Sequence, residues 1–307
     1  MKKRLLCFGF GYTARHLARH LDADEWDVAG TTRTGLWAEG LSRYHPDVRI
    51  LRLRGHDDSF LRDFQAVLED CTHLLVTAPP DENGDPFLRD YASVLEKAPV
   101  DWIGYTSSTG VYGDTRGDWV DETSPCRPGS ERAKLRLEAE DAWRAFGART
   151  GMPVTVFRLS GIYGPGRCTV SDLLRIESAA RGTPPVPIAK EGHVFSRIHV
   201  DDIARAVHAS MDAPGAGGLY NLADDEPAPH ADVVRYSYEL LGMPAPETLE
   251  FEDASRTMSP MALSFWSECR RVRNDRMKSD LGAELLYPSY REGLAAVLEE
   301  QRLPEAE

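Results

Sequence analysis

Short apolar runs alternate with segments of helical periodicity through the N-terminal half of the chain. The runs that predict strands lie at residues 4–9, 27–31, 48–53, 73–78, 101–107 and 153–159. After the first of them, apolar residues recur at the i, i+3, i+4 and i+7 positions of one helix face, at Ala14, Leu17, Ala18 and Leu21. Further helical patterns lie between the later strands, at 60–68, 87–97 and 128–143. Because strands that are separated by single helices form a parallel sheet covered on both faces, the pattern predicts an α/β fold with a doubly wound, Rossmann-type sheet.

The strand–helix alternation weakens after residue 164, where glycine and proline recur in the stretches GPGR and GTPPVP. One strand and one helix return at 197–211, and a short strand lies at 219–222. Beyond residue 224 the pattern indicates helical pieces and loops, with a basic cluster at Arg270, Arg271 and Arg273. We therefore expect a Rossmann-type domain from residues 1–165 and 195–224. Residues 166–194 and 225–307 are expected to form a smaller C-terminal lobe that binds the substrate.

The composition is that of an acidic globular protein, with 307 residues and a formal net charge of -13. Proteins that bind nucleic acids need a broad basic face, so no nucleic-acid partner is expected. The five cysteines are odd in number and form no CxxC, which favours a reducing, cytoplasmic compartment over a disulfide framework or a zinc site. No run of 18 apolar residues predicts a membrane span, and no spacing of histidines or acids predicts a metal site.

A glycine-rich stretch, GFGYTA, follows the first strand and opens the first helix. This is the context in which a Gly-x-Gly-x-x-Gly/Ala sequence binds a dinucleotide. Gly9 permits the tight turn, Gly11 lets the backbone approach a pyrophosphate, and Ala14 lets the helix pack closely on the strand. The pyrophosphate is expected at the N-terminus of the helix, where the backbone N–H groups and the helix dipole favour anions.

The second strand ends in GTTRTG, from Gly30 to Gly35, at the place where NAD sites carry an acidic residue for the ribose hydroxyl. Thr32 and Arg33 stand there instead. Arginine can hold a 2′-phosphate with two parallel hydrogen bonds, whereas a carboxylate repels it. The sequence therefore favours NADP(H) over NAD(H) as the cofactor.

Four further stretches occur in a fixed order, namely TSSTGVYGD, FRLSGIYGPGR, FSRIHVDDIARAV and GLYNLADDEP. With the glycine loop, they resemble the extended short-chain dehydrogenase/reductase superfamily, in its NAD(P)-dependent epimerase/dehydratase group. The resemblance implies hydride transfer to or from a nicotinamide, with a serine at the substrate oxygen and a Tyr-x-x-x-Lys pair for the proton. The serine that matches is Ser108, four residues before the Tyr112-Gly113 pair. The remaining cofactor contacts are expected from residues around these motifs, namely Phe10, Tyr12, Thr13, Ala78, Pro79, Ser107 and Ser160.

The helix expected to carry the Tyr-x-x-x-Lys pair, at 128–143, contains no tyrosine. Two alignments with the family pattern fit this helix. In the first, Lys134 is the family lysine and Ser130, which can also cap the helix, replaces the tyrosine. In the second, Arg136 replaces the lysine and Arg132 replaces the tyrosine.

Helix periodicity favours the second alignment. The first alignment turns Glu140 and Asp141 toward the core, and burying two unpaired carboxylates is expensive. The second places Ala142 and Trp143 inside instead. The proton-handling pair then consists of two arginines, which stay protonated and can clamp an anion but are poor acids and bases at neutral pH.

Another residue must then move the proton if the family reaction is retained. Tyr163 follows a strand at the edge of the sheet where such sites form, and is the first candidate. Weaker candidates are Tyr105, Tyr112, Asp121, Cys168 and His199. Two functions stay open. One is an oxidoreductase or epimerase that acts on a sugar-like or small carbonyl substrate, and the other is an NADP(H)-binding sensor without redox chemistry. A homodimer is also left open.

Overall fold

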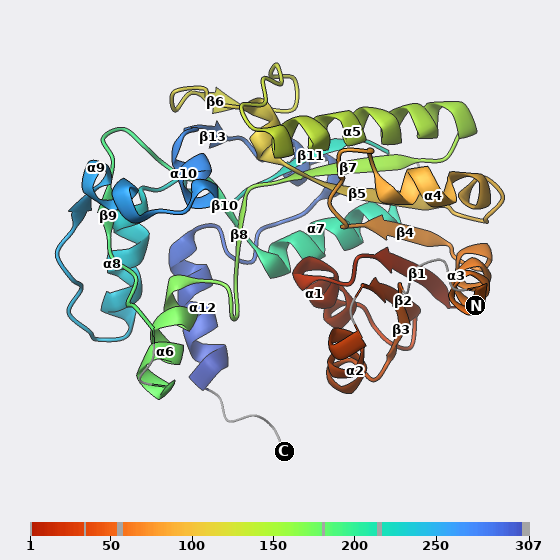
Figure 1. Cartoon of the computed structure of the whole chain (residues 1–307), viewed down its shortest axis with the longest axis horizontal. Helices are drawn as coiled ribbons and strands as arrows, with labels where there is room; N and C mark the ends of the chain where they lie inside the picture. Colours follow the sequence, from red (N-terminus) through yellow and green to blue (C-terminus); the bar gives the residue numbers. More distant parts are fainter. Residues whose placement is uncertain (1, 34, 54–57, 180–181, 214–216, 303–307) are drawn as a thin grey trace.

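The computed structural model of the protein describes residues 2–33, 35–53, 58–179, 182–213 and 217–302. Its centre is a sheet of seven parallel strands, which run across the middle and right of Figure 1. The strands lie side by side in the order β3 (Val48–Arg52), β2 (Trp26–Thr32), β1 (Lys3–Phe8), β4 (His73–Val76), β5 (Trp102–Ser108), β7 (Val154–Leu159) and β11 (Leu219–Leu222). The strand order changes direction at β1, as in doubly wound nucleotide-binding folds.

Helices cover both faces of this sheet. One face carries α1 (Tyr12–His20), α2 (Gly35–Tyr44), α7 (Val200–Asp212) and α11 (Asp275–Leu281). The other face carries α3 (Asp58–Glu69), α4 (Pro86–Leu95) and α5 (Glu131–Thr150). Two apolar clusters fill the layers between helices and sheet, one around Leu17, Phe157 and Ile203 and the other around Phe64 and Trp143. The doubly wound α/β fold expected from the sequence is confirmed.

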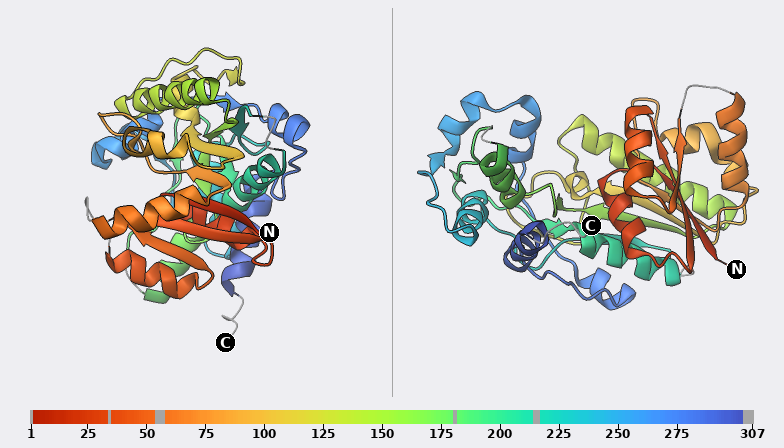
Figure 2. Two further views of the ribbon diagram at one scale, coloured as in Figure 1. Left: turned by 90° about the vertical axis from the view of Figure 1, so that its right-hand side faces the viewer. Right: turned by 90° about the horizontal axis from the view of Figure 1, so that it is seen from below.

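The remaining elements form a smaller lobe at the left of Figure 1, which Figure 2 shows from two further sides. Its helices are α6 (Thr169–Ala179), α8 (His230–Leu240), α9 (Phe251–Ala254), α10 (Pro260–Trp266) and α12 (Tyr290–Arg302), with a 3-10 turn at η3 (Ser255–Thr257). Two short parallel pairs join β8 (Gly161–Tyr163) to β10 (Arg197–His199) and β9 (Ile188–Ala189) to β12 (Leu249–Glu250). The apolar interior of this lobe is built around Val170, Val233, Tyr290 and Leu294.

Two contacts tie the lobe and its flanking segments to the sheet. The carboxylate of Asp202, in α7, accepts the backbone N–H groups of Leu286 and Tyr287 at 2.6 and 3.2 Å. A second parallel pairing joins β6 (Trp119–Val120), which follows β5, to β13 (Arg271–Val272) of the late chain. These contacts bring the late chain over the C-terminal edge of the sheet, where the strand-following loops lie. The division of the chain into two domains stays a prediction.

The strands expected in the N-terminal half are present within one or two residues at each end. The helix expected from 128–143 begins at Glu131 and runs on to Thr150, and the side chain of Ser130 caps it by accepting the N–H of Ala133. In the described part of the chain, no helix has the length and apolar character that crossing a bilayer requires.

Candidate active site

A cavity of about 610 Å³ lies at the C-terminal edge of the sheet. The segments that follow β1, β4 and β7 line it, together with the last residues of β5 and the first turns of α5. The lobe contributes the opposite wall, with Ser264 and Phe265 of α10 and the segment that carries Glu268 and Arg270. The carboxyl edge of a parallel sheet is where open α/β folds place their ligands.

The glycine turn after β1 leads into α1 at the rim of the cavity. Gly9 has φ +98°, and a Cβ there would lie 2.8 Å from Thr77 Oγ1 and 2.9 Å from the backbone nitrogen of Ala78. A residue with a side chain therefore fits neither the conformation nor the space. The Gly9 N–H donates to Thr31 Oγ1 at 2.8 Å, which holds the turn against β2.

The N-terminus of α1 has the features of an anion site. Gly11 is the N-cap residue and no side chain caps the helix, whose first turn also lacks an acid. A Cβ on Gly11 would meet nothing within 4 Å, so the backbone is open to the cavity, which Gly11, Tyr12 and Thr13 line. Uncapped N–H groups and the helix dipole together favour a phosphate at such a place.

The other residues expected in this region divide between the core and the surface. Ala14 and Phe10 are buried, and the Phe10 ring packs across Gly30, where a Cβ would lie 2.4 Å from it. The Phe10 N–H is bonded to the carbonyl of Thr31, so the role of Phe10 is to fix the turn rather than to donate to a cofactor. Ala78 is half-buried beside Gly9, and Pro79 is exposed.

At the end of β2, Thr32 is half-buried and Arg33 is exposed. The Thr32 carbonyl accepts the N–H of Leu53 on the neighbouring strand, which fixes the strand end. Neither residue lines the described cavity, which ends at the first turn of α1. Residue 34, the next in the stretch GTTRTG, lies outside the described residues.

Two serines at the end of β5 have different surroundings. Ser107 is buried and donates to the carboxylate of Glu140, in α5. Ser108 lines the cavity, and its Oγ accepts the N–H of Gly110 at 3.1 Å, which caps the short 3-10 helix η1 (Thr109–Tyr112). The Ser108 hydroxyl hydrogen has no acceptor among the described residues, so Ser108 can cap η1 and still donate to a substrate oxygen.

The unpaired hydroxyl of Ser160, after β7, bears on whether a cofactor fits this cavity. Its side chain is buried, lines the cavity, and has an Oγ without a hydrogen-bond partner in the described part of the chain. Buried polar groups are normally paired, so an orphaned hydroxyl at a cavity wall points to a polar ligand. With the open backbone at Gly11, it fits a dinucleotide that runs along this edge of the sheet.

Helix α5 directs two arginines to the cavity. Arg136 is half-buried, and its Nη1 donates to the Thr106 carbonyl at 2.7 Å and to Tyr105 Oη at 3.2 Å. Arg132, one turn earlier, is exposed, with its guanidinium 4.9 Å from the centre of the Phe265 ring. Lys134 instead lies outside the cavity and pairs with Glu131 on the surface at 3.4 Å.

The interior of α5 differs in part from the one that helix periodicity predicted. Trp143 is buried as expected, but Ala142 is exposed and Glu140 is buried. Glu140 is stable inside because it is paired, with Arg158 Nη2 2.7 Å from its Oε2. Helix periodicity predicts whether a position is buried, but it does not predict the ion-pair partner of a buried charge, which here comes from β7.

The side chain of Tyr163, the first candidate for proton transfer, packs into the lobe and is hydrogen-bonded there. Its hydroxyl donates to the carbonyl of Ser289 at 3.2 Å and lies against Gly293, where a Cβ would be 2.1 Å away. Burial and the nearby carboxylates of Asp224 and Asp202 raise the pKa of this tyrosine. The structure therefore argues against Tyr163 as a proton donor, because its proton is already bonded and is held more tightly than in water.

Residues of the lobe side and of nearby loops also line the cavity although the sequence did not single them out for it, among them Arg167, Arg197, Phe265, Glu268 and Arg270. The basic cluster at 270–273 was visible in the sequence and includes Arg270, but the sequence did not indicate which of its side chains faces the cavity. The described part of the chain holds no group of three or more histidine, cysteine or acidic side chains arranged for a metal ion.

A parallel sheet with a glycine turn, an uncapped helix and a cavity at this edge defines a dinucleotide-binding protein of the Rossmann type. Residues 89–223 match the model of the NAD dependent epimerase/dehydratase family. The chain is 43% identical to a structurally solved conserved protein of unknown function from Silicibacter pomeroyi DSS, which it matches over 97% of this chain and 99% of that one, with a TM-score of 0.85. Residues 89–223, a little under half of the chain, therefore carry the sequence pattern of the epimerase/dehydratase family on an NAD(P)-binding fold.

Two further proteins are similar over almost the whole chain. Protein YeeZ of Escherichia coli (strain K12) is 28% identical over 296 residues, which are 93% of this chain and 97% of YeeZ. A human epimerase family protein solved with NADPH shares the fold at a TM-score of 0.71 and 18% identity, over 96% of this chain and 99% of the human one.

Proposed function

We propose that the protein is an NADP(H)-dependent oxidoreductase or epimerase that acts on a sugar-like or small carbonyl substrate. One observation carries this proposal: a single cavity joins the open glycine turn and uncapped α1 to Ser108 and to a wall supplied by the lobe. The first part suits a dinucleotide and the second leaves room for a substrate beside it.

The residues that would hold the dinucleotide lie along the sheet edge. The first turn of α1 suits the pyrophosphate, because its N–H groups are uncapped and Gly11 leaves the approach open. Arg136 and the unpaired Ser160 hydroxyl are hydrogen-bond donors further along the cavity. When bound, the nicotinamide supplies or accepts a hydride.

A preference for NADP(H) is supported by the end of β2, where Arg33 is exposed and no acid occurs from Gly30 to Gly35. Fluorescence titration should give a lower Kd for NADPH than for NADH, and Arg33→Ala should weaken NADPH binding while leaving NADH binding unchanged. Arg43→Ala, an exposed arginine of α2, is the matched control. Tighter binding of NADH by the wild-type protein contradicts the preference.

At the substrate end, Ser108 offers a hydroxyl donor, and Arg132 with the half-exposed Phe265 ring forms the outer wall. Incubation of the protein and NADPH with a panel of aldoses, ketoses and 2-oxo acids tests the reaction through the loss of NADPH absorbance. Turnover that disappears in Ser108→Ala supports the proposal.

The second candidate is an NADP(H) sensor without redox chemistry. It is favoured by the arginine, Arg132, at the cavity position that the resemblance gives to the family tyrosine. NADPH binding with no turnover of any carbonyl compound in the panel supports the sensor and contradicts the oxidoreductase.

A further inference from the structure

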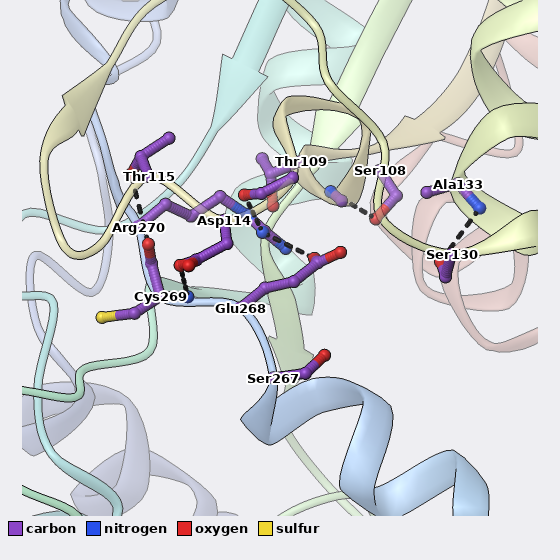
Figure 3. A network of polar contacts seen from close by, with 12 residues as sticks. Ser108, Thr109, Asp114, Thr115, Ser130, Ala133, Ser267, Glu268, Cys269 and Arg270 are labelled. Atoms are coloured by element: carbon purple, nitrogen blue, oxygen red, sulfur yellow. Dashed lines mark hydrogen bonds and ion pairs between the residues drawn. The ribbon is translucent and has the colours of Figure 1, made fainter.

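Glu268 and Arg270 form an ion pair in the wall of the cavity that the late chain supplies. Arg270 Nη1 donates to Glu268 Oε2 at 2.7 Å, and the two side chains are only 17% and 12% exposed. Figure 3 shows the Glu268 side chain pointing from the segment after α10 toward Ser108 and Ser130. One arginine of the basic cluster at 270–273 therefore faces the cavity, in company with a carboxylate.

The segment that carries this pair is fixed to the loop that follows Ser108. Asp114 Oδ1 accepts the N–H of Cys269 at 2.9 Å, and the Cys269 carbonyl accepts the N–H of Thr115 at 3.1 Å. Arg270 Nη1 also donates to the carbonyl of Gly113 at 2.7 Å. These bonds, drawn in part in Figure 3, hold the pair and the end of β5 in one fixed arrangement.

Polar atoms from both sides converge at this point. A Cβ on Gly110 would lie 3.3 Å from Ser108 Oγ and 3.9 Å from Arg270 Nη2, so both donors approach the same small space. Glu268 Oε1 reaches Gly129, where a Cβ would lie 2.8 Å from it. This oxygen has no hydrogen-bond partner within the described ranges and is free to accept a proton.

No other side chain described in the cavity wall is suited to moving a proton. The lining holds five arginines, which stay protonated, and two tyrosines. The hydroxyl of Tyr12 donates to the carbonyl of Pro165 at 3.1 Å, and that of Tyr163 donates to Ser289. Glu268 is the one carboxylate in the described lining, and no histidine, cysteine or lysine accompanies it there.

We propose that Glu268 is the catalytic residue that exchanges a proton with the substrate oxygen at Ser108, and that Arg270 is the residue that positions it. The proposal rests on the proposed function. In the oxidation of a secondary alcohol, the O–H bond breaks and its proton bonds to Glu268 Oε1. The oxygen electron pair closes the C=O bond as the carbon gives up its hydrogen with two electrons to the oxidised nicotinamide. The carboxylic acid then returns the proton to water, and the reduction reverses each step.

Glu268→Gln tests this role because glutamine keeps the shape and can still accept from Arg270. With the carbonyl compound that the wild-type enzyme reduces fastest, single-turnover hydride transfer should fall by about 100-fold to 10⁴-fold. The limb of the kcat/KM profile along which carbonyl reduction slows as the pH rises should change, because Glu268 must carry its proton to donate it. The Kd for NADPH should stay within about twofold of wild type, because the pair lies at the substrate end. Glu268→Asp should retain part of the rate, and added formate should restore part of it in Glu268→Ala.

Two further variants separate a catalytic from a structural role. Gly129→Ala keeps the carboxylate but displaces it, since its Cβ would lie 2.8 Å from Glu268 Oε1, and should slow hydride transfer without lowering the melting temperature. Glu239→Gln, an exposed glutamate of α8, should behave as wild type.

The outcomes distinguish the two proposals. Wild-type turnover that Glu268→Gln retains within about threefold overturns the role of Glu268 and leaves the proposed function standing. A wild-type protein that binds NADPH but neither reduces nor epimerises a compound of the panel overturns the proposed function and, with it, the role of Glu268.

Discussion

Glu140 and Arg158 form an ion pair that is almost completely buried behind the cavity, with side chains 2% and 4% exposed. Arg158 Nε donates to both carboxylate oxygens at 3.1 and 3.2 Å, and Nη2 donates to Oε2 at 2.7 Å. Ser107 also donates to this carboxylate, and the Arg158 guanidinium lies 4.8 Å from the centre of the Tyr112 ring. The pair therefore joins α5 to β7 and to the end of β5, one residue before Ser108.

Glu140→Ala should destabilise the protein strongly. The substitution leaves a buried guanidinium without its counter-charge and the Ser107 hydroxyl without its acceptor. Removing one partner of a buried pair costs about 3–5 kcal/mol. Asp141→Asn, which breaks the exposed pair with Arg144 on the same helix, should cost less than about 1 kcal/mol, because exposed pairs contribute little.

Equilibrium unfolding in urea, followed by tryptophan fluorescence and by circular dichroism, measures both variants. The double variant Glu140→Leu/Arg158→Met should regain much of the loss, since apolar residues of similar size can replace a buried pair at little cost. A free energy of unfolding for Glu140→Ala within about 1 kcal/mol of wild type would refute this reasoning and mean that water reaches the arginine.

Three other predictions concern the cofactor site and acid stability. Gly11→Ala should weaken NADPH binding at least about tenfold at unchanged stability, because the new Cβ meets no protein atom and enters the space left for the pyrophosphate. Gly9→Ala should instead unfold at a lower urea concentration, because Gly9 has φ +98° and the space for a Cβ is filled. Arg136→Ala should weaken NADPH binding roughly tenfold or more, measured by fluorescence titration. An unchanged affinity would mean that this arginine has only a structural role. Burial lowers the pKa of His199 to about 4, so the stability that its neutral form contributes is present above pH 6.5 and is lost as the pH falls toward 4. The loss should be about 2 kcal/mol between pH 7.5 and 5, and His199→Asn, which keeps an acceptor for the Asp201 N–H, should lose less in urea unfolding at the two pH values.

The sheet and the glycine turn could be predicted because their signals are local. An apolar run of four to seven residues inside a parallel sheet is buried on both faces, and β4, in the middle of the sheet, is buried at every position. The turn at Gly9 and Gly11 is likewise set by backbone conformation within a few residues. The burial of Glu140 could not be predicted in this way, because its partner Arg158 lies 18 residues further on and belongs to a different element.

The residues on the lobe side of the cavity could not be predicted from the sequence, for a related reason. Arg270 meets the carbonyl of Gly113 across 157 residues, and Glu268 lies in a segment between α10 and β13 that has neither helical nor strand periodicity. Without periodicity, the sequence does not fix which side chains face inward, so a basic cluster could not be distinguished from a solvated face. On the proposed function, the strand ends position the cofactor, and the groups that meet the substrate come from the least regular part of the chain. On these proposals, the chain keeps the family fold while Arg132 stands in the cavity wall at the place of the tyrosine that the resemblance implies. The lobe supplies a carboxylate to the same space without any change in the sheet.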